Sequence, residues 1–293
     1  MLIIGAGMTG CLASLIFPEA HIFEANDILP INHNAVLRFR DDSVSKVTGI
    51  PFKKVTVRKG IYVRGEYLQP NIMLANMYSK KVLGHTADRS IWNLDSVERY
   101  IAPANFQERL VNLVKSRIHL GQRLDYIPAE TVISTIPITN TLRSAGIETS
   151  AEFTFQKIFT GRYKVPKCNV YQTLYYPDDD CCVYRATITG DDLIIESTAP
   201  VILADLEYVV HSFGVDYPSK IIESTVQDYG KIKNIDETER HRLLYELTTT
   251  HDVYSAGRFA IWKNVLMDDV LKDLYKIKEL IYTTGYNRNK IGL

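Results

Sequence analysis

The sequence predicts an α/β fold, in which a parallel sheet with helices is joined to a second α+β domain with a mixed, largely antiparallel sheet. The chain opens with a short apolar strand at residues 2–4 (LII), which leads into a glycine-rich turn at residues 5–10 (GAGMTG) and an apolar helix. Further short buried strands are expected at residues 129–137 and 253–256, and residues 150–240 are β-rich and aromatic.

Each part of the opening unit has a physical task. Gly5 permits the tight turn, Gly7 lets backbone approach a phosphate, and Gly10 lets the helix pack close to the strand. The helix start offers unpaired N–H groups and a positive dipole end. Glu24 follows the second strand, 19 residues after Gly5, near the spacing of about 20 expected for a carboxylate that binds ribose hydroxyls. The unit predicts a Rossmann-like dinucleotide site, and a glycine turn without a ligand is the alternative.

The composition is that of a soluble globular protein. The chain has 293 residues, of which 46% are hydrophobic and 23% charged, and this length suggests about two domains. Lys+Arg and Asp+Glu both number 34, so the net charge of zero gives no overall attraction to nucleic acid or to an anionic membrane. We see neither a membrane span nor a signal peptide and expect a cytoplasmic protein without membrane association. The oligomeric state is left open.

The four cysteines give no sign of a metal or redox site. None has the spacing of a metal-ligand pair, and the adjacent Cys181 and Cys182 lack a base partner. We therefore expect reduced thiols and no bound metal.

The order of the elements predicts a discontinuous domain. Residues 1–34, 103–148 and 245–293 are expected to form the dinucleotide-binding domain, and residues 35–102 and 149–244 the substrate-binding domain. A ligand should then lie at the domain boundary, beyond the carboxyl ends of the parallel strands.

Local patterns predict the remaining elements. We expect helices at residues 71–83, 105–118, 201–213 and 264–281, a strand pair around Gly60, and antiparallel strands at residues 183–188 and 193–196. The region at residues 36–65 is locally basic and is interpreted as a solvated strand face, with a phosphate or nucleic-acid surface as the alternative. Its cations are Arg38, Arg40, Lys53, Lys54, Arg58, Lys59 and Arg64.

The segmentation favours FAD over NAD(P). A NAD(P)-dependent enzyme more often keeps its Rossmann unit in one block, whereas here a late strand ending at Gly257 and Arg258 returns with a following helix. A second helix start near the ligand suits a long molecule with a pyrophosphate and a ribityl chain.

Four stretches share a pattern with one superfamily. They are the opening turn with Glu24, residues 130–137 (ETVISTIP), residues 175–178 (YYPD) with Tyr184 and Arg185, and residues 255–262 (SAGRFAIW) with 267–269 (MDD). Residues 84–88 (GHTAD) and Trp92 add a fainter similarity. In these stretches the chain resembles the FAD flavoproteins of the glutathione-reductase-like superfamily, in the branch that holds amine oxidases and UDP-galactopyranose mutase.

The chain departs from that pattern in three places. The first helix is short by about four residues, or one turn. No Gly-Gly pair follows Glu24, and Tyr175 replaces the first residue of the mutase pattern N-Y-P-D. These departures concern the substrate more than the cofactor.

The resemblance implies a set of site residues. Arg258 would contact the FAD pyrophosphate or the flavin edge, with a structural salt bridge as the alternative. Asp268 or Asp269 would bind a ribityl hydroxyl, unless they only compensate the helix dipole. The full cofactor set is Gly5, Gly7, Met8, Thr9, Gly10, Glu24, Thr135, Gly257, Arg258 and Asp268.

Three residues are candidates for catalysis. Arg185 would hold an anionic group through two parallel hydrogen bonds, and its alternative is a surface arginine. His85 would transfer protons near the flavin, and its alternative is a structural loop histidine. Tyr176 would belong to an aromatic pocket with Tyr171, Tyr175 and Tyr184, a set that more often forms core.

The leading hypothesis is an FAD-dependent flavoenzyme that binds a small-molecule or nucleotide-linked substrate at the domain interface. In a mutase version, reduced flavin attacks a sugar anomeric carbon and Arg185 holds a nucleotide diphosphate. In an oxidase version, oxidised flavin takes a hydride from a C–N bond. The basic region at residues 36–65 admits a variant of the oxidase in which the amine is carried on a polymer such as modified nucleic acid. A non-catalytic dinucleotide-binding module and an NAD(P)-linked reductase are the alternatives.

Overall fold

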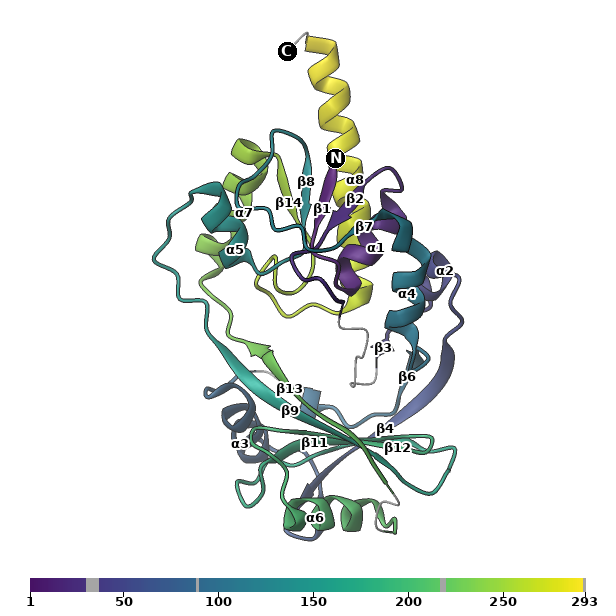
Figure 1. Cartoon of the computed structure of the whole chain (residues 1–293). Coiled ribbons are helices and arrows are strands. Elements are labelled where there is room, and N and C mark those ends of the chain that lie inside the picture. Colours follow the sequence, from purple (N-terminus) through teal and green to yellow (C-terminus); the bar gives the residue numbers. More distant parts are fainter. Residues whose placement is uncertain (30–36, 88–89, 217–219, 292–293) are drawn as a thin grey trace.

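The computed structural model describes residues 1–29, 37–87, 90–216 and 220–291 (Figure 1). Residue 36 of the basic region and Asp88 of the 84–88 motif lie outside the described residues. The described elements form two sheets, drawn one above the other in Figure 1, with chain segments connecting them on both sides. No helix in the described ranges has the length and apolar character needed to cross a membrane.

The upper sheet is a five-stranded parallel sheet with the order β14-β8-β1-β2-β7. Every pairing in it is parallel. Its strands are β1 (Leu2–Ile4), β2 (His21–Phe23), β7 (Ile118–His119), β8 (Val132–Ser134) and β14 (Val253–Ser255). The carboxyl ends of strands far apart in sequence therefore meet at one edge, as the fold class predicted.

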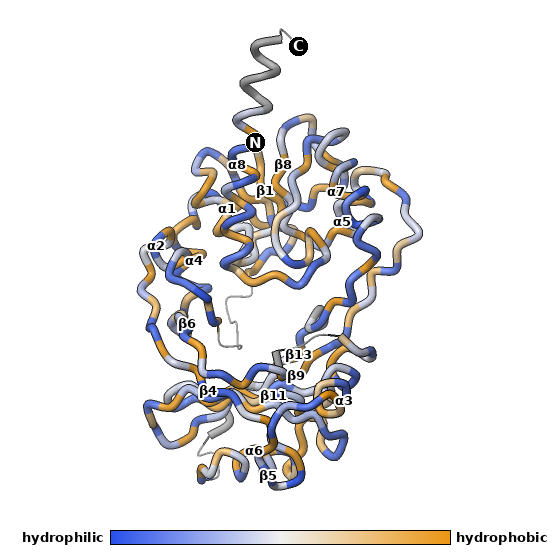
Figure 2. The backbone as a smooth tube through the Cα atoms, turned by 180° about the vertical axis from the view of Figure 1, so that it is seen from behind, coloured by the Kyte–Doolittle hydropathy of each residue, from blue (hydrophilic) through white to orange (hydrophobic). Residues whose placement is uncertain are grey.

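Helices cover both faces of this sheet because successive side chains alternate between them. Ile3 packs with α1 (Met8–Ile16), α4 (Phe106–Val114) and α8 (Met267–Ile291). Leu2 and Ile4 pack instead with α5 (Ile138–Ala145) and α7 (Glu237–His251). The view from behind in Figure 2 shows hydrophobic residues along β1 and β8, between these helix layers.

Helix α1 has only nine residues, and basic side chains close its carboxyl end. Arg117 Nη1 donates to the carbonyls of Ser14 (2.6 Å) and Pro18 (3.0 Å), and Lys278 Nζ donates to Ile16 O (2.9 Å). The last carbonyls of a helix have no hydrogen-bond donor within the helix, so these cations supply the donors that a further turn would have supplied.

The lower sheet is mixed and has nine strands, in the order β13-β9-β12-β11-β10-β4-β6-β3, with β5 beside β4. Only the β10–β4 pairing is parallel among those described. The strands are β3 (Arg38–Phe39), β4 (Lys53–Val63), β5 (Glu66–Leu68), β6 (Val97–Ile101), β9 (Phe155–Lys164), β10 (Tyr171–Tyr175), β11 (Val183–Thr189), β12 (Asp192–Ser197) and β13 (Lys220–Ile232).

The two faces of the lower sheet differ in character. Leu174, Ala186 and Ile195 pack against α6 (Leu203–Phe213). The alternate residues on these strands, which include Thr173, Arg185 and Glu196, therefore face away from α6. Figure 1 shows the parallel sheet on this second side of the lower sheet, so a polar strand face is turned toward it. A second helix, α3 (Ile72–Leu83), packs near one end of the sheet on Ile61, Tyr175 and Tyr184.

The hairpin expected around Gly60 is wrong. Residues 53–63 form one continuous strand, and the chain turns at Arg64 (φ 49°) and Gly65 (φ 92°) before β5. Gly60 is needed for another reason, because a Cβ there would lie 2.8 Å from Leu174 Cδ2. The turn expected after residue 189 is confirmed, with Gly190 at φ 70° between β11 and β12.

Candidate functional site

The glycine turn lies at the carboxyl end of β1 and contains three glycines with different tasks. Gly5 has a φ of 96°, and a Cβ on Gly10 would lie 1.9 Å from Gly5 O, so both are required by the turn itself. Gly7 is exposed, has a φ of −66°, and a Cβ there would meet nothing within 4 Å. The open side of Gly7, next to Met8 and Thr9 at the start of α1, is therefore the room available to a ligand.

Glu24 is held beside this turn by hydrogen bonds from the backbone. Its Oε2 accepts from Ala6 N (2.9 Å), and its Oε1 accepts from the backbone N (3.0 Å) and Nδ2 (2.7 Å) of Asn26. A carboxylate oxygen has more than one acceptor position, so the half-buried carboxylate retains capacity for ribose hydroxyls.

The hydroxyl of Thr135 hydrogen-bonds to the backbone of the glycine turn rather than facing a ligand. It follows β8, and its Oγ1 lies 2.8 Å from Ile4 O and 3.1 Å from Gly5 O. This hydroxyl ties two parallel strands together at the edge where the turn begins.

The loop after β14 lies directly on the start of α1. Gly257 has a φ of 90°, and a Cβ there would lie 2.7 Å from Thr9 Oγ1. Arg258 points elsewhere, since its Nη2 donates to Gly230 O at the end of β13 (2.6 Å) and its guanidinium lies 5.4 Å from the Phe259 ring centre. Burial lowers the pKa of Arg258. Gly257 thus lies at the turn, whereas Arg258 contacts the connection to the lower sheet.

Asp268, in the first turn of α8, is fully buried. Its Oδ2 accepts from Arg40 N (2.9 Å), and burial raises its pKa. Within the described ranges, Asp268 Oδ1 has no hydrogen-bond partner, which is costly for a buried carboxylate oxygen. Asp269 makes an ion pair with Arg40 (2.7 Å).

Arg185 lies on the face of the lower sheet that is turned away from α6. It makes a two-pronged ion pair with Glu196, through Nε to Oε2 and through Nη2 to Oε1 (2.6 Å). Tyr184 OH also donates to Glu196 Oε1 (3.1 Å). Burial alone would raise the pKa of Glu196, but Arg185 holds it at about 2. Arg185, which was expected to hold a substrate anion, therefore uses two of its donors in an ion pair within the protein.

Tyr176 and His85 take positions that differ from their expected roles. Tyr176 is fully buried on the α6 side of the lower sheet, and its hydroxyl lies 2.6 Å from Ser212 Oγ. We therefore assign Tyr176 to the core, because strand alternation directs it away from the polar face. His85 is exposed after the end of α3, with Nδ1 3.0 Å from Leu83 O, and the contacts of the described residues do not bring it to the glycine turn.

Arg38 was named only as one cation of the basic region, which was interpreted as a solvated strand face with a phosphate or nucleic-acid surface as the alternative. Its side chain is half-buried, and its Nη1 donates to Thr173 Oγ1 (2.7 Å). Burial, and next the neighbouring Arg185, lower its pKa to about 10. The only available signal was the adjacent Phe39, because alternation in a strand sends neighbouring side chains to opposite faces.

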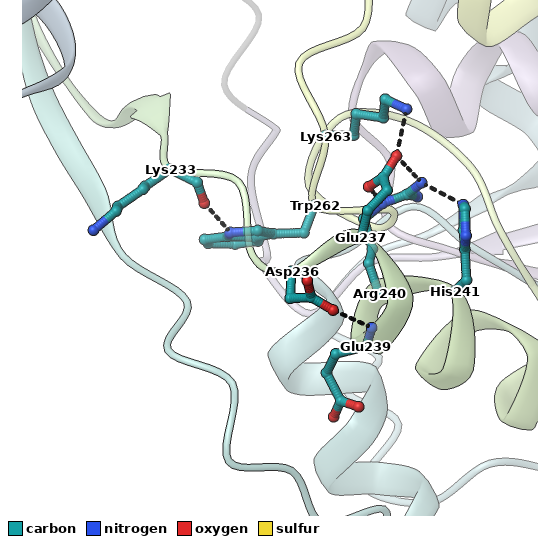
Figure 3. A network of polar contacts seen from close by, with 8 residues as sticks. All are labelled: Lys233, Asp236, Glu237, Glu239, Arg240, His241, Trp262 and Lys263. Carbon is teal, nitrogen blue, oxygen red and sulfur yellow. Dashed lines mark hydrogen bonds and ion pairs between the residues drawn. The ribbon is translucent and has the colours of Figure 1, made fainter. Parts of the chain in front are cut away.

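A pocket of about 380 Å³ lies away from the glycine turn. Its lining comes from the connecting segments at residues 150–154 and 233–236 and from Glu239 of α7, and it contains none of the predicted site residues. Figure 3 shows the polar contacts beside it, where Trp262 Nε1 donates to Lys233 O (2.9 Å) and Asp236 accepts from Glu239 N (3.0 Å). We place the candidate site at the strand ends, because the open side of Gly7 and the oriented carboxylate of Glu24 lie there.

Solved structures match the chain in fold. Reduced UDP-galactopyranose mutase has a TM-score of 0.66 at 15% identity, over 96% of this chain and 95% of that one. A fatty acid isomerase from P. acnes that produces CLA has a TM-score of 0.63 at 12% identity, over 95% and 97%. Klebsiella pneumoniae HpxO, complexed with FAD and uric acid, has a TM-score of 0.51 at 12% identity, over 88% and 72%. No family model and no curated protein sequence matches.

These similarities show that the chain has the fold that HpxO and the mutase share, a Rossmann-type domain with a second sheet domain.

Proposed function

We propose that the chain is an FAD-dependent flavoenzyme whose cofactor lies across the carboxyl edge of the parallel sheet. The observation that carries this proposal is the pairing of an open Gly7 with a carboxylate, Glu24, already fixed beside it. The N–H groups at the start of α1 would hold the pyrophosphate, and Glu24 would hold the ribose. The fold match to HpxO, which was solved with FAD, supports this choice of dinucleotide.

The remaining residues at this edge also fit a long cofactor. Asp268 offers a buried carboxylate oxygen that accepts no hydrogen bond from the described residues. A hydroxyl of a ribityl chain would supply the missing donor. The Gly257 loop lies on Thr9 and closes the other side of the turn. When bound, FAD would supply the reactive flavin ring, as a nucleophile or as a hydride acceptor, and the protein would bind and orient the substrate.

The polar face of the lower sheet favours a charged substrate. Arg38, Arg185 and Glu196 lie there, whereas Tyr176 faces the opposite way. A pocket for amine oxidation would instead be aromatic with few charges. We therefore infer a mutase-like use of the site, on a polar substrate with an anionic group, as the first hypothesis, and oxidation of a C–N bond as the second.

The cofactor proposal is tested by an absorbance spectrum of the purified protein and mass spectrometry of the released cofactor. We expect a flavin spectrum and the mass of FAD. Gly7→Ala should weaken FAD binding at least tenfold and leave the thermal stability of the flavin-free protein unchanged, because the methyl group enters open space. Gly10→Ala is the contrasting variant and should destabilise the fold itself, because its methyl group meets Gly5 O.

Two results would contradict the proposal. One is a colourless protein that takes up no flavin on reconstitution, which would leave a non-catalytic module. The other is a released nicotinamide dinucleotide.

A second experiment distinguishes the two reactions. Turnover that requires dithionite-reduced flavin supports the mutase-like chemistry, and flavin bleaching by amines supports the oxidase.

A further inference from the structure

Arg38 is placed where the two sheets meet. Strand β3 consists of Arg38 and Phe39, whose side chains point to opposite sides. Phe39 is buried in the core of the parallel sheet, with ring centres 4.6 Å from Phe52 and 5.9 Å from Phe106. Arg38 therefore lies on the opposite side of β3, the edge strand of the lower sheet, and contacts Thr173 of β10, 135 residues away in sequence.

The backbone that carries Arg38 is also fixed to the cofactor edge. Two residues later, Arg40 N donates to Asp268 at the start of α8 (2.9 Å), and Arg40 Nη1 pairs with Asp269 (2.7 Å). The guanidinium of Arg38 is thus held between the proposed cofactor site and the polar face of the lower sheet.

Positive charge exceeds negative charge around Arg38. Glu196, a carboxylate on this face, interacts electrostatically with Arg38. Glu196 already makes a bidentate ion pair with Arg185. Lys231, whose Nζ lies 5.4 Å from the Tyr184 ring centre, also acts electrostatically on Glu196. In the described part of the chain, Arg38 donates to one side-chain acceptor, the neutral hydroxyl of Thr173.

A half-buried guanidinium with a neutral partner is an incomplete arrangement. A buried charge is costly unless it is paired, and guanidinium presents five N–H donors. Burial lowers the pKa of Arg38 to about 10, and an anion would oppose that shift. The hydroxyls of Thr173 and Thr187, 3.1 Å apart, line the same spot with further polar atoms.

We propose that Arg38 is the anion receptor of the substrate site and binds a phosphate or carboxylate group of the substrate. In this assignment Arg185 is a positioning residue, because its ion pair with Glu196 fixes the polar face on which the anion lies. The inference rests on the proposed function, since the anion belongs to a substrate that would react beside the cofactor.

The test is a calorimetric titration of the flavin-loaded protein with pyrophosphate at constant ionic strength. We expect Arg38→Met to weaken binding at least tenfold and Arg38→Lys to retain part of it, because lysine keeps the charge and loses the two-pronged geometry. Glu196→Gln should tighten binding severalfold, because it removes the competing carboxylate from Arg185. Arg64→Met is the matched control, because Arg64 is an exposed arginine in the β4–β5 turn that pairs with Asp180, and this variant should bind as the wild type does.

The outcomes separate this inference from the proposed function. Equal pyrophosphate affinity in the wild type and in Arg38→Met, with flavin bound in both, would overturn the inference and leave the flavoenzyme intact. If the protein binds no flavin, the titration is made in the Gly7→Ala background, in which the glycine turn is blocked. Binding that still depends on Arg38 there would support the anion receptor while the cofactor proposal fails.

Discussion

The carboxylate oxygens of Glu24 accept hydrogen bonds within the fold, and the same oxygens would accept hydrogen bonds from a ligand. Its two oxygens accept hydrogen bonds from Ala6 and Asn26, so the carboxylate is oriented before any cofactor arrives. Side chains held by the backbone lose little freedom on binding, which is the basis of preorganisation.

We predict that Glu24→Gln lowers FAD affinity by about tenfold to a hundredfold, because a hydrogen bond to a charged acceptor contributes about 1.5–3 kcal/mol. The amide nitrogen would also face a donor of Ala6 or Asn26. Flavin fluorescence titration measures the effect. The control is Glu19→Gln, an exposed carboxylate between α1 and β2. Equal affinity of Glu24→Gln and the wild type would remove Glu24 from the site.

The Arg185–Glu196 pair predicts a loss of stability in acid. The pKa of Glu196 is depressed from 4.5 to about 2, so its contribution is fully present above about pH 5 and is lost as pH falls toward 2. The contribution is on the order of 2–3 kcal/mol. Urea unfolding at pH 7 and pH 3 should therefore show a difference between the wild type and Glu196→Gln that shrinks in acid.

Glu239→Gln is the matched comparison for that measurement. The pKa of Glu239 is also lowered to about 2, by hydrogen bonds from Arg242 and Thr149, but solvent screens this more exposed pair. Its substitution should change the pH dependence much less. A pH-independent difference at Glu196 would show that the ion pair is not linked to folding.

At the level of elements, α1 shows how a helix one turn short is completed by distant residues. Its apolar pattern gives the inner face, but its carboxyl end depends on Arg117 and Lys278, which are about 100 and 260 residues away.

We predict that Lys278→Ala and Arg117→Ala each destabilise the protein by about 1–2 kcal/mol, because each leaves helix-terminal carbonyls without a donor. Urea unfolding monitored by circular dichroism measures the loss. Lys276→Ala is the control on the same helix, since Lys276 is mostly exposed and lies 3.8 Å from Asp273. Equal free energies of unfolding in the three variants would refute a stabilising role of Arg117 and Lys278 at the carboxyl end of α1.

Elements were predictable where local sequence decides them. The opening unit, the strand expected within residues 129–137 and the helix expected at residues 201–213 follow from turn glycines and apolar spacing. The structure confirms them, with the strand at residues 132–134 and the helix α6 at residues 203–213. Helix α7 was missed because its apolar residues do not form a clear stripe, and it is stabilised by packing of Leu243 and Leu247 on the sheet. Gly60 suggested a turn, although its lack of a side chain serves the contact with Leu174.

The site was predictable in part for the same reason. Turn residues at strand ends can be recognised from the local sequence. Register in the lower sheet, which the local sequence does not give, determines the pairing of Arg185 with Glu196 and the contact of Arg38 with Thr173. Tyr176 was expected in an aromatic pocket, with the core as the alternative, and its burial in the core also depends on register, because one residue along a strand reverses the direction of a side chain.

At the scale of the whole molecule, the loop beside the cofactor edge also holds the connection between the sheets. Residues 257–264 follow β14, and three of their side chains donate to carbonyls at the exit of β13. Arg258 donates to Gly230, and Asn264 donates to Ile232 (3.4 Å). Trp262 donates to Lys233 (2.9 Å), as Figure 3 shows. Since Gly257 lies on Thr9, one loop contacts both the glycine turn and the connecting segment.

This arrangement predicts that Trp262→Phe loosens the connecting segment and weakens FAD binding severalfold. Phenylalanine keeps an aromatic ring against Phe153 but loses the hydrogen bond to Lys233 O, in a side chain that is 1% exposed. Hydrogen exchange followed by mass spectrometry should show faster exchange at residues 230–236 in the variant. In the wild type, FAD should slow exchange in the same residues, because ordering the loop at Gly257 also orders the carbonyl contacts that it makes. Trp92→Phe, which alters a half-exposed tryptophan, controls for loss of an indole. Unchanged exchange at residues 230–236 in Trp262→Phe, with and without FAD, would show that the loop and the connecting segment move independently.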